Sequence, residues 1–296
     1  MSASGALALV AGAAAVTAAA LMPAARRLAL RTGLLDGPGD RKAQRAPVPL
    51  LGGAVLLLGT AAGCAALAGA GAPVPGPGLT LGALAAFLVG LWDDRRKERP
   101  LGPLPKLLGQ TGAVLLFVLL DRPGPAPALG VFWMLAVVTA WNFFDNADGS
   151  LPAVGAVAAL ALAIVGEPPV AGIAAALAGA LLGFLPWNLP PARAYAGDAG
   201  SHLTGFVLGA LPLLTSRPDS SVPPVLLMGA LALPLLDLVQ VVVVRLALGL
   251  SPAIGDRRHL AHRLERLGLG PRATLAVLVA VALLLAALPA LGRSHA

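Results

Sequence analysis

The feature that most constrains the fold of this chain is a series of long apolar runs separated by short polar gaps. A membrane-spanning helix needs about 20 apolar residues, with about 17–25 as the usual range. The runs predict spans at 4–23, 48–70, 77–92, 105–120, 127–144, 150–166, 169–187, 202–216, 222–246 and 271–291. A composition of 57% hydrophobic and 12% charged residues also places the chain among integral membrane proteins. The sequence therefore predicts a single all-α membrane domain over residues 1–296, with about ten transmembrane helices.

The basic residues are distributed unevenly between the two sets of gaps. All but three of the 21 Lys and Arg residues lie in or beside alternate gaps. The three exceptions are Arg122, Arg217 and Arg293. Because cytoplasmic loops of multi-span proteins keep Lys and Arg, this alternation predicts the orientation in the plasma membrane. It places both termini outside. The first run has its basic residues after it rather than before it, which indicates a first span and not a cleaved signal peptide.

The same gaps hold nearly all the side chains suited to chemistry, so the active site is expected in catalytic cytoplasmic loops. The formal net charge of +7 lies on that face and suits anionic headgroups and anionic substrates. Because the basic residues are dispersed among short loops rather than forming one stripe, a nucleic-acid partner is not expected.

Two blocks of acidic residues follow apolar runs. Asp93 and Asp94 are adjacent carboxylates, which repel each other unless a divalent cation or nearby bases balance them. Asn142, Asp145 and Asp148 are spaced by three, so on a continued helix they would share one face. Such oxygen ligands suit Mg²⁺, a sugar hydroxyl or a uracil edge. In each case the alternative is a solvated or capped helix end.

Two further blocks contain an isolated acid and a pair of histidines. Asp198 lies between glycines that would let the backbone approach a ligand, and Tyr195 is the single tyrosine of the chain. Tyr195 is suited to stacking on a base or to the interfacial aromatic belt. His259 and His262 are three residues apart, beside arginines. They lack the further ligands of a zinc site, so phosphate binding fits better, with a lipid-surface helix as the alternative.

In this order, the four blocks resemble the polyprenyl-phosphate N-acetylhexosamine-1-phosphate transferase superfamily, glycosyltransferase family 4. The segments Asp36–Lys42 and Pro47–Gly53 resemble the first cytoplasmic loop of that family. The resemblance covers most of the chain and implies a reaction between a UDP-sugar and polyprenyl phosphate that releases UMP. It implies Mg²⁺, with Mn²⁺ as the alternative ion, and leaves room for a homodimer in the bilayer.

The resemblance also implies residue roles. Asp93 and Asp94 would bind the lipid phosphate or Mg²⁺ and take up the proton of the attacking phosphate. Asp145 and Asp148 would contact the nucleotide and sugar or act in catalysis. Asp198 would be the Mg²⁺ ligand, Tyr195 would stack on uracil, and His259 and His262 would bind the donor diphosphate. The other expected substrate-binding residues are Lys42, Lys106, Asn142, Arg193, Arg257 and Arg263.

The chain departs from the family pattern at a few positions. These are Gln44, Thr139, Asn146 and Ala261. None of them removes an aspartate, so activity is expected to survive. The segment from Asp256 to Leu264 resembles the N-acetylglucosamine-1-phosphate branch, which favours UDP-GlcNAc as the donor. The phospho-MurNAc-pentapeptide transferases of peptidoglycan synthesis are the alternative branch.

Two other classes of protein compete with the enzyme interpretation. Transporter sites normally lie near the bilayer midplane, at broken helices and between repeats. Here the acids lie at span ends, and Asp237 is the one charged residue in the middle of a span. An inert scaffold related to the family is the other alternative, and retention of the loop aspartates weakens it.

Overall fold

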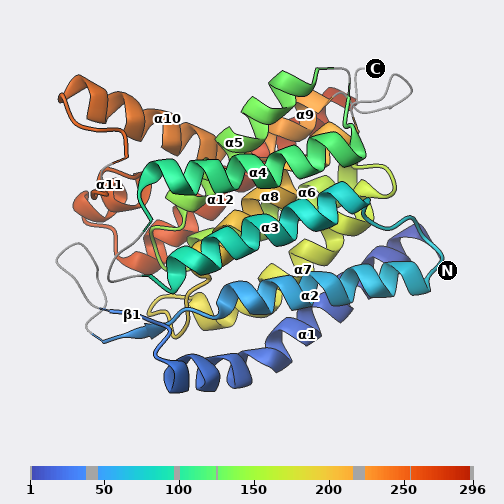
Figure 1. Cartoon of the computed structure of the whole chain (residues 1–296), viewed down its shortest axis with the longest axis horizontal. Helices are drawn as coiled ribbons and strands as arrows, with labels where there is room; N and C mark the ends of the chain where they lie inside the picture. Colours follow the sequence, from blue (N-terminus) through green and yellow to red (C-terminus); the bar gives the residue numbers. More distant parts are fainter. Residues whose placement is uncertain are drawn as a thin grey trace.

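The protein is described by a computed structural model, which covers residues 2–37, 46–96, 101–124, 126–215, 224–253 and 255–293. These residues form a bundle of helices that run along a common direction (Figure 1). The helices are α1 (Ala3–Thr32), α2 (Gly52–Gly69), α3 (Pro77–Asp94), α4 (Pro103–Asp121), α5 (Pro127–Phe144), α6 (Ser150–Val165), α7 (Val170–Asn188), α8 (Gly197–Leu214), α9 (Pro224–Gly229), α10 (Ala232–Ala247), α11 (Leu260–Arg266) and α12 (Pro271–Arg293). Each predicted span overlaps one of these helices, or a pair of them.

Among the described residues, five helices are long and apolar enough to cross a membrane: α1, α2, α4, α5 and α7. The multi-pass all-α prediction is thus confirmed in outline, whereas the number ten stays a prediction. Helices α6 and α12 have shorter apolar stretches, of 10–17 residues.

The predicted span 222–246 is wrong as a single helix. Helix α9 ends at Gly229 and α10 begins at Ala232. Pro234, in the first turn of α10, has no N–H to bond to the carbonyl of Ala230, so a continuous helix would lose a hydrogen bond there. The break divides the span and gives α10 its own direction.

Two short strands, which the sequence did not predict, pair at one end of this mostly helical bundle. Strand β1 (Leu35–Asp36) lies antiparallel to β2 (Val48–Pro49), with Leu35 opposite Pro49. Residues 48–51 were expected to begin the second span, but Val48 and Pro49 pair with β1 instead, and the carbonyl of Pro49 accepts the N–H of Tyr195 at 2.8 Å. Helix α2 therefore starts at Gly52, after the strand.

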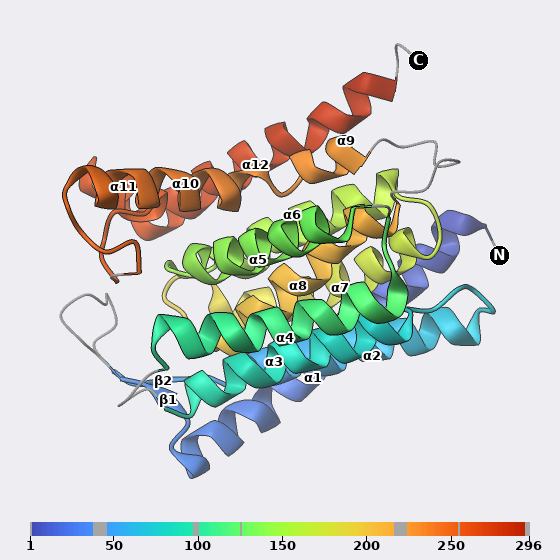
Figure 2. The same ribbon diagram turned by 45° about the horizontal axis from the view of Figure 1, so that its top comes forward.

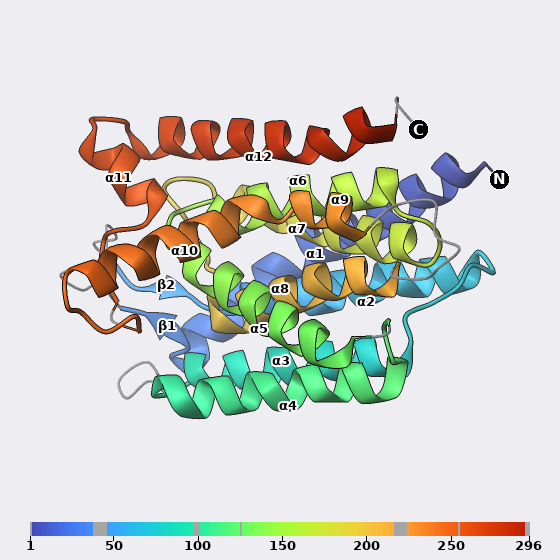
Figure 3. The same ribbon diagram turned by 90° about the horizontal axis from the view of Figure 1, so that it is seen from above.

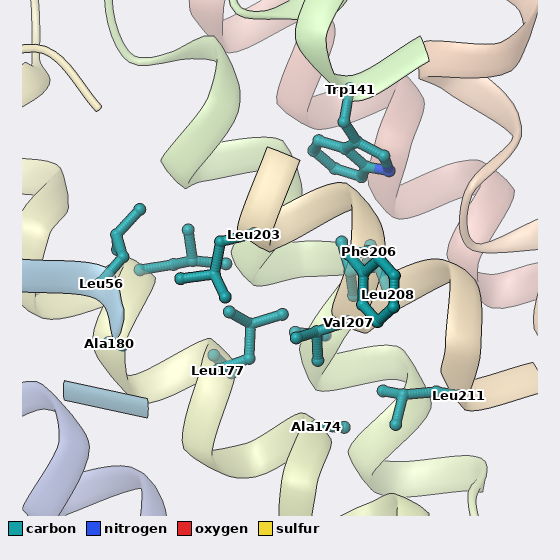
Figure 4. Packing of buried hydrophobic residues seen from close by; sticks show 14 of the residues in the cluster. Leu56, Trp141, Ala174, Leu177, Ala180, Leu203, Phe206, Val207, Leu208 and Leu211 are labelled. Carbon is teal, nitrogen blue, oxygen red and sulfur yellow. The ribbon is translucent and has the colours of Figure 1, made fainter. Parts of the chain in front are cut away.

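Helix α8 lies at the centre of the bundle and packs against α3 and α5 (Figure 3). Its buried face carries Leu203, Phe206 and Leu211, which lie among side chains of neighbouring helices such as Trp141 and Leu177 (Figure 4). Burial of these large apolar side chains fixes α8 in position. The polar residues of its first turn are thereby fixed as well.

Small residues allow α1 and α7 to approach closely. A Cβ atom added at Gly179 or Gly183 of α7 would lie 2.1 or 2.3 Å from the backbone oxygens of Ala11 and Ala15. Close approach at small residues is the usual way in which helices associate in a bilayer, where apolar burial gives little drive. Helix α1 lies at the side of the bundle that is remote from α10, and α7 lies inside the bundle (Figure 2).

Helices α3 and α5 end where α4 and α8 begin, so four helix termini meet at one end of the bundle (Figures 1 and 2). The strands and α11 lie at the same end, whereas the first turn of α1 and the last turn of α12 lie at the other. The chemistry-bearing gaps are therefore gathered at one end, as the charge alternation predicts. The membrane face that this end occupies stays a prediction.

Candidate active site

The ammonium group of Lys106 lies between two carboxylates. Its Nζ is 2.7 Å from Oδ2 of Asp93 and 2.6 Å from Oδ2 of Asp198. The three residues come from the end of α3, the first turns of α4 and the first turn of α8. The other oxygen of Asp93 accepts the N–H of Leu101 at 2.6 Å. One ammonium thus joins two carboxylates, and when both carboxylates are ionised the three groups together carry a net negative charge.

Helix α5 contributes an amide to the same group. Nδ2 of Asn142 donates to Oδ1 of Asp198 at 3.1 Å and lies 3.0 Å from Oγ of Ser201. Both oxygens of Asp198 are therefore oriented by side chains of other helices. We call Asp93, Lys106, Asn142, Asp198 and Ser201 the carboxylate cluster.

Asp94 has different surroundings from its neighbour Asp93. Its two oxygens accept the backbone N–H groups of Asp198 and Ala199, each at 3.0 Å, and its side chain is buried. A carboxylate at this point satisfies amides that the first turn of α8 leaves free, and it lies at the positive end of the helix dipole. Asp94 thus holds the start of α8, and with it Asp198.

Two glycines make this approach of α3 to α8 possible. A Cβ atom at Gly90 would lie 2.2 Å from the backbone oxygen of Asp198, and one at Gly197 would lie 2.5 Å from Oδ2 of Asp94. Gly197 also has a φ of 67°, which favours glycine.

A second polar contact joins α4 to α8 one turn deeper in the bundle. Nε2 of Gln110 lies 3.0 Å from Nε2 of His202, and both side chains are buried. These residues follow Lys106 and Asp198 by four positions on their respective helices, so the two contacts lie one above the other. This pair was not predicted from the sequence, although a Gln and a His inside apolar runs were a signal.

A pocket of about 670 Å³ lies among the loops before α6, α8 and α12. Asp148, Ala192, Tyr195 and Arg272 line it. Oδ2 of Asp148 accepts the N–H of Ala192 at 2.9 Å, and the hydroxyl of Tyr195 is hydrogen-bonded to the same carboxylate. Burial raises the pKa of Asp148, and burial together with that carboxylate raises the pKa of Tyr195.

Asn188 at the end of α7 joins two of the loops that line the pocket, those before α6 and before α8. Its Oδ1 accepts the N–H of Gly149 at 3.0 Å, and its Nδ2 donates to the carbonyl of Ala194 at 2.9 Å. The side chain is buried. Asn188 was not predicted from the sequence, in which an amide at the end of an apolar run was the available signal.

The last polar segment, from Ser251 to Arg266, folds onto α10; we call it the histidine loop. Nδ1 of His259 lies 2.8 Å from Oδ2 of Asp237, and Nδ1 of His262 lies 3.2 Å from Oε2 of Glu265. Two further arginines are held inside the loop. Arg257 pairs with Glu265 at 3.3 Å, and Nε of Arg263 donates to the carbonyl of Arg258 at 3.0 Å.

A buried arginine anchors the first half of the histidine loop. Arg245 of α10 makes two hydrogen bonds of 3.1 Å to the carboxylate of Asp256, and Arg258 pairs with the same carboxylate at 2.6 Å. Burial alone would raise the pKa of Asp256, but the hydrogen bonds from the two arginines outweigh it and lower that pKa.

Comparison with known proteins identifies the family. Residues 77–216, which include the carboxylate cluster and Tyr195, match the family described as Glycosyl transferase family 4. The chain is 35% identical over 273 residues to a putative glycosyltransferase of Streptomyces coelicolor, covering 87% of this chain and 63% of that protein. It is 28% identical over 292 residues to decaprenyl-phosphate N-acetylglucosaminephosphotransferase of Mycolicibacterium smegmatis, covering 82% and 71%. The chain belongs to glycosyl transferase family 4.

A further match, which is partial, is to a protein of the phospho-MurNAc-pentapeptide transferase branch. The chain is 40% identical over 163 residues to phospho-N-acetylmuramoyl-pentapeptide-transferase of a Synechococcus strain, covering 52% of this chain and 41% of that protein. The chain therefore spans less than two thirds of the Streptomyces and Synechococcus proteins.

Not every residue expected in the site of a family 4 transferase lies as the sequence predicted. The prediction that Asn142, Asp145 and Asp148 share one helical face is wrong, because α5 ends at Phe144. Asp145 is the C-cap residue of that helix, and Asp148 lies in the following turn, where it meets the loop of Ala192. Asn142 thus contacts Asp198, whereas Asp148 contacts the loop before α8.

Arg193 and Lys42 were also expected in the site. Nη2 of Arg193 donates to the carbonyl of Pro186, and its guanidinium lies over the ring of Trp187 at 4.7 Å, so in this structure it contacts the end of α7. Lys42 and the departure Gln44 lie outside the described residues.

The carboxylate cluster offers oxygen ligands of the kind that Mg²⁺ prefers. Among the residues that the structure describes, no three His, Cys, Asp or Glu side chains form a metal-binding group. Mg²⁺, however, is often bound by one or two carboxylates together with substrate phosphates and water. Asp93 and Asp198 fit that pattern, because their carboxylates lie 2.7 and 2.6 Å from the same ammonium group of Lys106.

Proposed function

We propose that the protein transfers a sugar-1-phosphate, with GlcNAc-1-phosphate as the first candidate, from a UDP-sugar to polyprenyl phosphate and releases UMP. The observation that carries the proposal is the position of Lys106 between Asp93 and Asp198 at the start of α8. The decaprenyl-phosphate N-acetylglucosaminephosphotransferase among its relatives supports the same reaction.

The acceptor phosphate is proposed to bind at Lys106. A fixed ammonium group neutralises phosphate charge, and Asp93 beside it orients the attacking oxygen and acts as base for a phosphate that arrives protonated. The polyprenyl chain would remain among the apolar helices. This arrangement requires Lys106 to exchange part of its contact with the carboxylates for the phosphate.

Asp198 is proposed as the principal ligand of Mg²⁺ or Mn²⁺, with Asp93 and substrate oxygens completing the site. A divalent ion bound there would neutralise charge on the transferred phosphoryl group. Asn142 and Asp94 act on Asp198 itself: the amide orients Oδ1, and Asp94 fixes the backbone N–H at 3.0 Å. Asp94 is thereby given a supporting role, and of the adjacent aspartates only Asp93 is proposed to contact the acceptor.

The donor is proposed to place its uracil in the pocket of Tyr195 and Asp148. An aromatic face suits stacking on a base, and a carboxylate suits the N–H of uracil. Arg272 lines the same pocket and adds a positive charge. His259, His262 and the arginines of the histidine loop would bind the diphosphate, which is consistent with charge-assisted hydrogen bonding to phosphate.

In the proposed step an oxygen of the lipid phosphate attacks the β-phosphorus of the UDP-sugar. A new P–O bond forms as the bond from the β-phosphorus to the bridging oxygen breaks, and UMP leaves with that oxygen and its electron pair. Catalysis of this kind depends mainly on positioning and charge neutralisation. The proposed setting is the cytoplasmic face of the plasma membrane.

The contacts of Asp237 argue against the transporter alternative. This carboxylate was the feature a transporter could use, but it is buried and bound to His259 and to the N–H of Leu260. Its partners belong to the histidine loop at the site end. The MurNAc-pentapeptide branch remains the second candidate for the donor, supported by the partial Synechococcus match.

The test is a UMP-release assay on purified protein with polyprenyl phosphate and a panel of UDP-sugars, with Mg²⁺, Mn²⁺ or a chelator. We expect release with UDP-GlcNAc that requires both the lipid phosphate and a divalent ion. Turnover of UDP-MurNAc-pentapeptide alone would assign the other branch. Absence of release with every donor, from a protein that is folded and loaded into lipid nanodiscs, would contradict the proposed function.

A further inference from the structure

Asp237 connects α10 to the histidine loop through two short hydrogen bonds. Its Oδ2 lies 2.8 Å from Nδ1 of His259, and its Oδ1 accepts the N–H of Leu260 at 2.8 Å. Leu260 is the first residue of α11, and His259 is its N-cap. One carboxylate, 1% exposed, therefore fixes both an imidazole ring and the helix that follows it.

The next turn of α10 adds a third contact. Nε2 of Gln240 donates to the carbonyl of Arg258 at 3.0 Å and lies 3.4 Å from Oδ1 of Asp237. Three consecutive residues, 258–260, are thus held by one face of α10. The ring of His259 also packs edge-on against Phe143 of α5, with centroids 6.0 Å apart.

Phe143 links this arrangement to the carboxylate cluster. It directly follows Asn142, whose amide donates to Asp198. The guanidinium of Arg245 lies 5.5 Å from the centroid of the same Phe143 ring. The end of α5 therefore lies between Asp198 and the histidine loop, and α10 determines where the loop lies relative to it.

The chemistry of the pair decides which nitrogen faces a ligand. A carboxylate only accepts hydrogen bonds, so the ring donates its Nδ1 proton to Asp237 and leaves Nε2 for a substrate. A carboxylate behind a histidine fixes the tautomer and orientation of the ring in metal sites by the same means.

We propose that Asp237 is a positioning residue for the donor diphosphate: it acts through His259, whose Nε2 it presents to the phosphate oxygens. This inference rests on the proposed function, because the ligand is the diphosphate of the UDP-sugar. Gln240 serves the same end by holding the carbonyl of Arg258.

The test is a double-mutant cycle on the binding of UDP, which needs no turnover. The proteins are wild type, Asp237→Asn, His259→Ala and the double variant, purified in detergent. Asn has the shape of Asp, but one carboxylate oxygen is replaced by an NH2 group, which cannot accept a hydrogen bond, so one of the two contacts is lost. We expect each single variant to bind UDP on the order of tenfold more weakly, the effect typical of residues that orient a ligand. The double variant should bind no more weakly than His259→Ala.

The matched control is Asp121→Asn. The Asp121 carboxylate also accepts two backbone N–H groups, from Gly78 and Leu79 at 2.7 Å each, but at the opposite end of the bundle. This control should bind UDP as wild type does. A second variant, Asp237→Glu, keeps a carboxylate on α10 and should bind UDP better than Asp237→Asn; equal or weaker binding would overturn the proposal.

The remaining outcomes separate the two hypotheses. Asp237→Asn with wild-type affinity, or losses that multiply in the double variant, would overturn the positioning role and leave the proposed function intact. Wild-type protein that binds no UDP would overturn the proposed function and this inference with it. In turnover assays the same variants should raise the donor KM and leave the KM of the lipid acceptor unchanged.

Discussion

Asp94 holds the backbone N–H of Asp198 at 3.0 Å, across 104 residues of sequence. The adjacent Asp93 points its Oδ2 at Lys106 instead. Two neighbouring carboxylates that look equivalent in the sequence therefore have different partners. One supports the start of a helix, and the other belongs to the charged group that is proposed to bind phosphate.

The two aspartates should respond differently to the same substitution. Asp94→Asn leaves one backbone N–H at the start of α8 without its acceptor, which should lower the free energy of unfolding by about 1–3 kcal/mol. Asp93→Asn removes one of two carboxylates that share an ammonium, so stability should change little while UMP release falls. Thermal unfolding in detergent and the UMP assay measure the two effects. Equal loss of thermal stability in both variants would contradict this division of roles.

Lys106→Met should leave Asp93 and Asp198 facing each other without a cation. Removing one partner of a partly buried ion pair destabilises, by about 1–3 kcal/mol here because the Lys side chain is 21% exposed. Transfer should be lost. Added Mg²⁺ should raise the melting temperature of this variant more than that of wild type, since the ion replaces the missing charge. Lys106→Arg is the control, and an equal Mg²⁺ response in all three proteins would argue against a cation site at these carboxylates.

Gly90→Ala should disturb the site through sterics alone. The added methyl would lie 2.2 Å from the backbone oxygen of Asp198, so α3 and α8 must separate, at a cost of about 1–3 kcal/mol or more. Gly112 on α4 is the matched control, because an added Cβ there meets nothing within 4 Å. Gly112→Ala should be neutral or stabilising by up to about 1 kcal/mol, as in other helix interiors. The comparison uses melting temperature and UMP release, and similar values for the two variants would refute the close-contact argument.

Asp148→Asn should stabilise the protein increasingly as pH rises. Burial raises the pKa of Asp148, so its stabilising contribution is present below the ordinary Asp pKa of about 4 and is lost as pH rises through the raised pKa. Asparagine does not titrate. The difference in unfolding free energy between variant and wild type should therefore move in favour of the variant between about pH 4 and pH 7, while donor binding weakens.

Asp256→Asn should change the pH dependence of the unfolding free energy in the opposite direction. The pKa of Asp256 is lowered, so its contribution is present above the unfolded pKa and is lost as pH falls through the folded value. This variant should be less stable than wild type near neutral pH, and the difference should shrink in acid. Melting temperatures of both variants across the same pH series test the two signs together, and parallel curves would contradict both.

Much of the architecture followed from patterns that are local in the sequence. Apolar runs predicted the helices, and the alternation of Arg and Lys predicted that Asp93, Asp198 and His259 lie at one end. The failures were local as well. Pro49 lies in a strand before α2 begins, and Pro234 lies in the first turn of α10, just after the break from α9. The stripe through Asp145 failed because α5 ends one residue earlier.

The sequence by itself determined the class of protein, the family and the set of residues available for chemistry, because hydrophobicity, charge and motif order are properties of the chain. Only the tertiary structure decided the partners of those residues. Lys106 and Asp198 are 92 positions apart, and Asp237 and His259 are joined across a turn between helices. Such contacts depend on how whole helices pack, so no local pattern showed that Asp94 supports α8 or that Asp237 holds a histidine.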